Sequence, residues 1–89
     1  MRIYGFDWDE QNLEHIGKHG VRDYEVEEVV LFGKPIFQKS LDNTYVAFGI
    51  TQDGRYLLVV FIAKGHGLIR SITARDMTDR EKHNYRKRR

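Results

Sequence analysis

Arg75 is the side chain whose type and position most favour chemistry in this 89-residue sequence. It ends a strand-like run, and Thr78 with Glu81 three residues later predicts a capped helix start just beyond it. A guanidinium beside the free N–H groups of a helix start can bind a phosphate. The alternative is a structural arginine paired with Asp76, Asp79 or Glu81, and we favour the phosphate-binding interpretation.

His15 and His19 have the spacing at which two imidazoles on one helix face can hold a metal ion. The sequence has no cysteine and no evident third ligand, so we expect no metal site and no metal cofactor. The alternative role of His19 is structural, near the free carbonyl groups of a helix end. Serine catalysis is not indicated, because Ser40 and Ser71 lie outside any nucleophile-elbow sequence and no glycine-rich phosphate loop is present.

Basic residues are concentrated in the second half of the chain, although the net charge is only +2. Residues 1–53 carry five Lys and Arg against ten Asp and Glu, whereas residues 54–89 carry ten against three. This asymmetry indicates one positive face, suited to a polyanion or an acidic partner. The alternative is a solvated basic tail, because residues 86–89 hold four of these charges.

The composition fits a small protein of a reducing compartment, since there is no cysteine for a disulfide framework. The longest apolar run, Leu57–Ala63, is much shorter than the about 20 residues that span a bilayer as a helix. The first residues lack the apolar core of a signal peptide. We therefore expect a soluble, cytoplasmic protein with one domain over residues 1–89.

Apolar spacing and capping residues predict three helices, and apolar runs between turn residues predict four strands. The expected helices are Glu10–Lys18, capped by Asp7 or Asp9 and ended by Gly20; Asp23–Leu31, ended by Gly33; and a C-terminal helix after Thr78. The expected strands are Ile36–Ser40, Tyr45–Gln52, Tyr56–Ala63 and Leu68–Arg75. Because the links are short, the predicted fold is α+β, with two N-terminal helices, a four-stranded antiparallel meander and a C-terminal helix.

The turns also predict a register for the central hairpin. If Asp53-Gly54 forms a two-residue turn, Ile50 faces Leu57 and Val46 faces Phe61. The face that carries these side chains is then the core, covered by the first two helices. The opposite face is expected to lie under the C-terminal helix or a partner.

The same alternation places Ile72 in the core and puts Arg70 and Arg75 on opposite faces of the last strand. Two arginines arranged in this way cannot share one site unless a β-bulge intervenes. We therefore expect Arg75 to act apart from Arg70, beside the start of the C-terminal helix.

Five short stretches, spread over nearly the whole chain, form a further pattern. They are Phe6-Asp7-Trp8-Asp9, Lys18-His19-Gly20-Val21, Gly54-Arg55-Tyr56-Leu57-Leu58-Val59-Val60, Ile72-Thr73-Ala74-Arg75, and Glu81 with Tyr85. In this order they resemble the BrnT toxins of bacterial type II toxin–antitoxin systems. The sequence departs from that pattern at Thr73, where serine is commoner, and at Arg22-Asp23, where a small capping residue is frequent.

The resemblance implies a RelE-like ribonuclease fold and RNA cleavage that stops translation. It also implies neutralisation by a BrnA-like antitoxin, in a hetero-oligomer that binds promoter DNA through the antitoxin, and no metal cofactor. The family's site positions carry over to Lys18 and His19 at the first helix end and to Arg75 at the strand end.

The expected reaction is metal-independent attack of a ribose 2′-hydroxyl on its neighbouring phosphate. Arg75 would stabilise the developing charge, and His19 would transfer protons. Lys18, Lys64 and Arg70 would hold the phosphate backbone close to the reaction.

Further RNA contacts are expected from the C-terminal helix, through Arg80, Lys82 and Arg86. Tyr85 would either stack on a base or pack in the core. The alternative function is a non-catalytic nucleic-acid-binding or assembly module that uses the basic C-terminal half.

Overall fold

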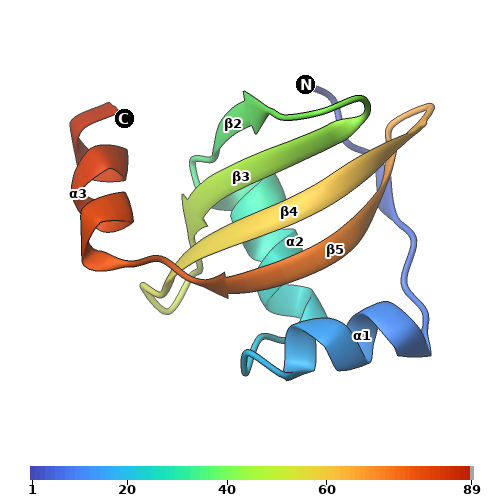
Figure 1. Cartoon of the computed structure of the whole chain (residues 1–89), viewed down its shortest axis with the longest axis horizontal. Coiled ribbons are helices and arrows are strands. Elements are labelled where there is room, and N and C mark those ends of the chain that lie inside the picture. Colours follow the sequence, from blue (N-terminus) through green and yellow to red (C-terminus); the bar gives the residue numbers. More distant parts are fainter. Residues whose placement is uncertain (89) are drawn as a thin grey trace.

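One sheet with helices on both faces makes up the computed structural model, which describes residues 1–88 (Figure 1). Its elements are β1 (Gly5–Phe6), α1 (Glu10–Gly17), α2 (Asp23–Phe32), β2 (Ile36–Lys39), β3 (Thr44–Ile50), β4 (Tyr56–Gly65), β5 (Leu68–Asp76) and α3 (Asp79–Arg88). The strand order is β1-β5-β4-β3-β2. None of the described helices is long and apolar enough to cross a membrane.

The sheet has five strands and is mixed, which corrects the predicted four-stranded antiparallel sheet. Strands β2 to β5 form the expected antiparallel meander. In addition β1 pairs in parallel with the start of β5, where Gly5 lies opposite Leu68 and Phe6 opposite Ile69. A two-residue strand carries no periodicity, so the sequence pattern gave no signal for it.

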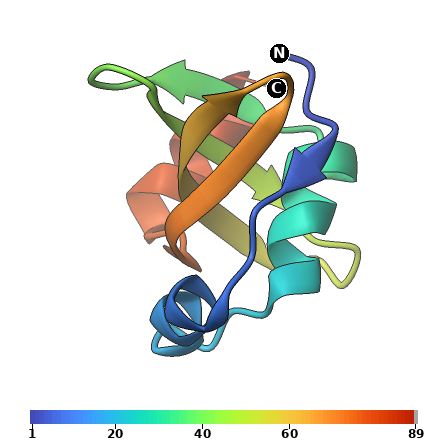
Figure 2. The ribbon, with the colours of Figure 1, turned by 90° about the vertical axis from the view of Figure 1, so that its right-hand side faces the viewer.

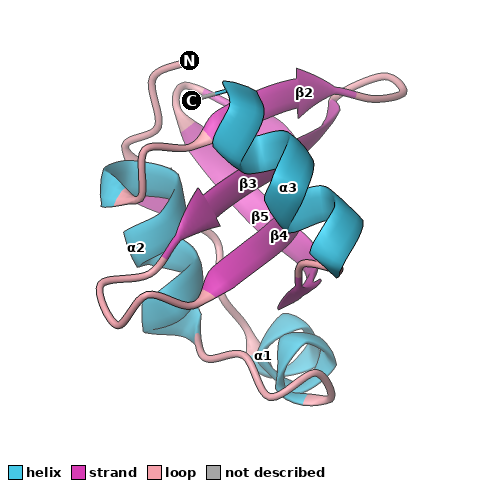
Figure 3. Ribbon diagram, turned by 90° about the vertical axis from the view of Figure 1, so that its left-hand side faces the viewer, coloured by secondary structure: helices cyan, strands magenta, loops and turns pink. Residues whose placement is uncertain are grey.

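The helices cover the faces as expected. Ile16 of α1 and Val26 of α2 are fully buried in one cluster with Val59 and Phe61 of β4. On the other face, α3 covers a second cluster that contains Leu58 of β4 (Figure 3). The site-bearing strand β5 therefore lies in a sheet that is held from both sides.

The predicted register between β3 and β4 is wrong by one residue, because Ile50 lies opposite Tyr56 and not Leu57. The connecting loop has three residues, 52–54, instead of two. Gly54 ends it with a φ of +87°, which is the usual geometry of a three-residue hairpin loop. A slip of one residue moves every β3 side chain to the other face. Val46 accordingly packs on the α3 side, while Ala47 is fully buried under α1 and α2.

A β-bulge in β5 overturns the expected place of Ile72. Thr73 lies opposite Val60 and Ser71 opposite Phe61, so Ile72 is the extra residue between them. Ile72 is exposed, and Ser71 is buried in its place. This bulge changes which β5 side chains face α1.

The ends of α1 follow the predicted capping. The backbone N–H of Asn12 donates to Asp9 Oδ1 over 3.0 Å, so Asp9 is the N-cap. At the other end Gly20 has a φ of +71°, and the N–H groups of Gly20 and Val21 donate back to Gly17 and Ile16. These bonds form a Schellman motif, which fixes the backbone of the turn at residues 18–20.

Candidate functional site

Arg75 stands near the end of β5 and is bound to a carboxylate of α3. Its Nη1 and Nη2 atoms donate to Glu81 Oε1 and Oε2 over 2.8 and 3.0 Å. Nη1 also donates to the backbone oxygen of Asp76 over 3.0 Å. The Arg75 side chain remains 39% exposed. The structure thus contains the ion pair that the sequence offered as the alternative, with the guanidinium still reachable from solvent.

Glu81 holds the start of α3 as well as Arg75. The N–H of Thr78 donates to Glu81 Oε1 over 2.8 Å, and the N–H of Glu81 donates to Thr78 Oγ1 over 3.2 Å, which confirms the predicted capping box. The Arg75 guanidinium, helped by the Thr78 N–H, lowers the pKa of Glu81 to about 2. The carboxylate is therefore ionised at neutral pH.

Replacing Glu81 by glutamine is expected to lower the free energy of unfolding at pH 7 by roughly 1–2 kcal/mol. A carboxyl whose pKa falls from 4.5 to about 2 on folding would add about 3.4 kcal/mol if fully shielded, and exposure of the pair reduces this. Because the folded pKa is lowered, the contribution is complete above pH 4.5 and is lost as the pH falls toward 2. Urea unfolding at pH 7 and pH 2.5 measures it. Glu14→Gln, at an exposed position, is the control. If Glu81→Gln lowered the free energy of unfolding by the same amount at both pH values, the prediction would be contradicted.

Arg55 joins the end of β5 to the turn after α1. Its Nε donates to Asp76 Oδ1 over 2.7 Å, and its Nη1 lies 3.0 Å from Glu25 Oε1 of α2. Nη1 also donates to the backbone oxygen of Gly20 over 2.9 Å, and Nη2 to that of His19 over 3.4 Å. Hydrogen bonding to Asp76, and less strongly to Glu25, raises the pKa of Arg55, while Arg55 lowers the pKa of Asp76. Arg55 therefore fixes the distance between the α1 turn and β5.

Lys18 and His19 lie in this turn, and both side chains are exposed. Because Arg55 binds the His19 carbonyl and the Asp76 carboxylate, the turn lies next to the C-terminal end of β5. The backbone oxygen of Asp76 is in turn bound by Arg75. The structure thus brings the predicted Lys18, His19 and Arg75 to one end of the sheet.

Helix α3 adds cations around an aromatic ring at the same end. The guanidinium carbon of Arg86 lies 5.0 Å and the Lys82 Nζ 5.8 Å from the centre of the Tyr56 ring. Arg86 Nε also donates to the Tyr56 hydroxyl over 3.3 Å. Arg80 is exposed on the first turn of α3. Lys82 and Arg86 therefore extend the positive surface from Arg75 along α3.

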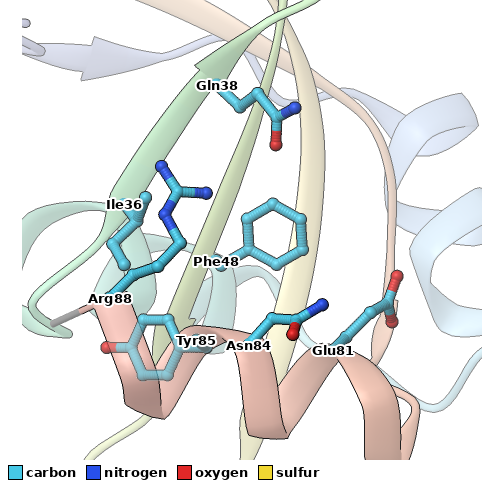
Figure 4. A pocket seen from close by; sticks show the side chains of 7 residues that line it. All are labelled: Ile36, Gln38, Phe48, Glu81, Asn84, Tyr85 and Arg88. Atoms are coloured by element: carbon cyan, nitrogen blue, oxygen red, sulfur yellow. The ribbon is translucent and has the colours of Figure 1, made fainter.

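Tyr85 packs in the core, which is the second of the two roles that the sequence left open, and it is not placed to stack on a base. Its side chain is 2% exposed, and its hydroxyl donates to the backbone oxygens of Gly33 and Lys34 over 3.1 and 2.9 Å. Its ring forms part of the wall of a small pocket, of about 120 Å³, between α3 and strands β2 and β3 (Figure 4). Phe48, Glu81 and Arg88 also line this pocket, so its wall is mixed in character.

Lys64 and Arg70 lie toward the opposite end of β5, away from Arg75. Arg70 Nη2 is 2.9 Å from Asp9 Oδ2, and Lys64 Nζ is 3.4 Å from Asp7 Oδ2. The N–H of Asn12 and then Arg70 lower the pKa of Asp9. The bulge at Ile72 puts Arg70, opposite Ile62, on the same sheet face as Arg75, opposite Leu58, which corrects the predicted placement on opposite faces. The two arginines still form no common site, because Arg70 is held by the segment before α1 and Arg75 by α3. Of the three cations expected to hold the phosphate backbone near Arg75, Lys64 and Arg70 are thus paired with carboxylates away from it.

The family model for the ribonuclease toxin BrnT, of type II toxin–antitoxin systems, matches residues 8–81. The chain belongs to the BrnT family. BrnT proteins are ribonuclease toxins of type II toxin–antitoxin systems, so RNA is the target and a protein antitoxin is the partner. A search of curated proteins finds no match to the chain.

The BrnT match covers Lys18, His19, Arg55 and Arg75 and ends at Glu81. Within residues 1–88, no group of three or more His, Cys, Asp or Glu side chains is arranged to hold a metal ion. Arg55 was missed as a site residue, although it stands in one of the stretches that carry the BrnT resemblance. Nothing in its local pattern distinguishes it, because its partners are 21 to 36 residues away in the chain.

Proposed function

We propose that this BrnT chain cleaves RNA without a metal ion, at the C-terminal end of β5. The 2′-hydroxyl of a ribose attacks the neighbouring phosphate, which yields a 2′,3′-cyclic phosphate and a free 5′-hydroxyl. The observation that carries the proposal is that Arg75 and the Lys18–His19 turn lie at the same end of the sheet, joined through Arg55 and Asp76.

Arg75 stabilises the charge that develops on the phosphorane oxygens. A guanidinium has five N–H donors. Three bonds to Glu81 and Asp76 hold Arg75 in one orientation and leave other donors for a phosphate oxygen. A donor that is already oriented needs no rearrangement when the charge develops. The Glu81 ion pair is thus compatible with a role of Arg75 in binding the transition state.

His19 is the proposed proton-transfer group, because the nearby carboxylates are poor bases. Glu81 has a pKa of about 2, and Arg55 lowers the pKa of Asp76. A base is most effective when its pKa lies near the working pH, so strongly paired carboxylates accept protons weakly. Imidazole is the side chain that ordinarily titrates between pH 5 and 8. The exposed His19 is held beside β5 through its own backbone.

Lys18 and the α3 cations Arg80, Lys82 and Arg86 hold the RNA backbone on either side of Arg75 in this proposal. Their exposed or partly exposed side chains support it, since phosphate contacts supply most non-specific affinity for nucleic acid. Tyr85, Lys64 and Arg70 take no part in this arrangement.

The proposal includes a BrnA-like antitoxin that neutralises the toxin in a hetero-oligomer and binds promoter DNA. The chain would act in the cytoplasm, where translation takes place. Co-expression with the reading frame next to the toxin gene tests this part, because relief of growth arrest and co-purification are expected. Growth arrest that persists despite expression of that protein would contradict it.

Incubating the purified chain with single-stranded RNA in excess EDTA tests the reaction. We expect cleavage at an undiminished rate, with cyclic phosphate and 5′-hydroxyl ends on the fragments. Cleavage that stops in EDTA and returns with Mg²⁺ would contradict the mechanism. A salt-sensitive mobility shift with intact RNA under all conditions would instead support the non-catalytic binding module.

A further inference from the structure

A second pocket, separate from the Arg75 end, lies between α1 and β5. Its volume is about 210 Å³, several times the about 30 Å³ that one water occupies in the liquid. It is lined by Gln11, Asn12, His15, Arg70, Ser71 and Ile72. No step of the proposed cleavage uses this pocket.

Ser71 is the unusual residue of this pocket. It is 2% exposed, and its Oγ has no hydrogen-bond partner in the described part of the chain. Buried hydroxyl groups in native proteins nearly always have a partner, and one without a partner destabilises the fold. The bulge at Ile72 turns Ser71 toward the inner face, where an alanine would pack without this cost. An unpartnered hydroxyl on a residue that lines a pocket points to a ligand that completes its hydrogen bonding.

The charges of the pocket indicate what kind of ligand it accepts. Arg70 is the cation of the lining, and Asp9 and Asp7 lie 2.9 and 3.6 Å from its guanidinium. Its charge is therefore offset, and the site is not built for a phosphate. The Asn12 amide is bound to the backbone of Asp9 and Asp7. The remaining polar groups are the Gln11 amide, the His15 imidazole and the Ser71 hydroxyl, beside the exposed apolar side chain of Ile72. Neutral donors and acceptors next to an apolar surface suit the edge and face of a nucleobase.

The pocket lies on a path that leads to the proposed cleavage site. Strand β1 pairs only with Leu68 and Ile69, so the outer edge of β5 from Arg70 to Asp76 has no strand beside it in the described chain. Helix α1 runs below this edge instead (Figure 2). Ser71 and Arg75 are four residues apart, which is about 13 Å along a strand. Ser71 faces the α1 side of the sheet and Arg75 the α3 side, so an RNA segment that reaches both crosses this free edge. A short single-stranded segment can span both.

We propose that this pocket binds one unpaired base of the RNA substrate, flanking the cleaved phosphate, with the Ser71 hydroxyl bonded to the edge of that base. This inference rests on the proposed function, because it assigns a specificity subsite to the same reaction. Sequence-specific recognition of single-stranded RNA commonly uses unstacked bases in such polar pockets. The pocket would decide where the toxin cuts, and Arg75 with His19 would decide how fast.

Ser71→Ala tests the subsite, with the exposed Ser40→Ala as the matched control. We expect Ser71→Ala to keep or raise the melting temperature, since it removes a buried hydroxyl without a partner. On a pool of RNA sequences, its preference between bases at the flanking position is expected to fall about 2- to 10-fold, the effect of one hydrogen bond. Ser40→Ala should keep the parent's preference. A Ser71→Ala profile identical to the parent's, or a parent with no base preference, would overturn the proposal.

Titration of isotope-labelled protein with adenosine, cytidine, guanosine and uridine separates this inference from the cleavage proposal. At least one nucleoside is expected to shift the amide signals of Asn12, His15 and Ser71 until they saturate. Ser71→Ala is expected to weaken the binding of that nucleoside. If the shifts occur but RNA stays intact, the pocket binds a base and the cleavage proposal fails, and with it the pocket's role in choosing the cut. If RNA is cleaved but no nucleoside shifts these signals, the subsite is wrong and the cleavage proposal stands.

Discussion

Replacing Arg75 by alanine is expected to slow RNA cleavage by about 10²- to 10³-fold, the usual effect of removing one oriented donor from a developing oxyanion. Arg75 is held in one orientation by Glu81 and by the Asp76 backbone, so it can act without reorganisation. Single-turnover cleavage of a labelled RNA measures the rate. RNA affinity should fall far less than the rate, because Lys82 and Arg86 remain on α3.

Three further variants separate chemistry from folding in this experiment. Arg75→Lys keeps the charge but loses the planar fork, so its rate should lie between those of the parent and Arg75→Ala. Arg75→Ala with Glu81→Gln also removes the carboxylate that loses its guanidinium partner in the single variant, and it should not restore cleavage. Arg2→Ala makes the same change of charge in the first residues and should cleave like the parent. A folded Arg75→Ala that cleaves at the parent's rate would remove Arg75 from the mechanism.

Replacing His19 by alanine is expected to slow cleavage by about 10²- to 10⁴-fold, the range attributed to a positioned acid or base. The turn should keep its shape, because Arg55 binds the backbone oxygen of His19 and Gly20 supplies the helix end. The pH–rate profile of the parent should have a limb between pH 5 and 8, and His19→Ala should lose this limb. Rates measured across that range test both expectations.

His83→Ala is the control, since it removes another exposed imidazole, on α3 and outside the proposed chemistry. It should keep both the rate and the shape of the profile. If His19→Ala keeps the limb, another group transfers the proton. If His83→Ala loses the limb, the assignment to His19 is wrong in the same way.

The sequence by itself determined the local structure and the family. The helix starting at Glu10, the Asp9 cap, the Gly20 helix end and the Thr78–Glu81 capping box are all present as predicted. Each depends on hydrogen bonds between residues at most five apart, so the residues that decide it are neighbours in the sequence. The BrnT resemblance was also visible in the sequence, because its short stretches occur in order along the chain.

The tertiary structure alone decided how those elements meet. A loop of three residues instead of two moved Val46 to the other face, and a single bulge exchanged Ile72 for Ser71 in the interior. The sequence offered three carboxylates as partners for Arg75, and only the packing of α3 selected Glu81. It gave no signal for the contacts of Arg55. The physical reason is that these features depend on pairing between distant segments, in which a shift of one residue reverses which side chains are buried.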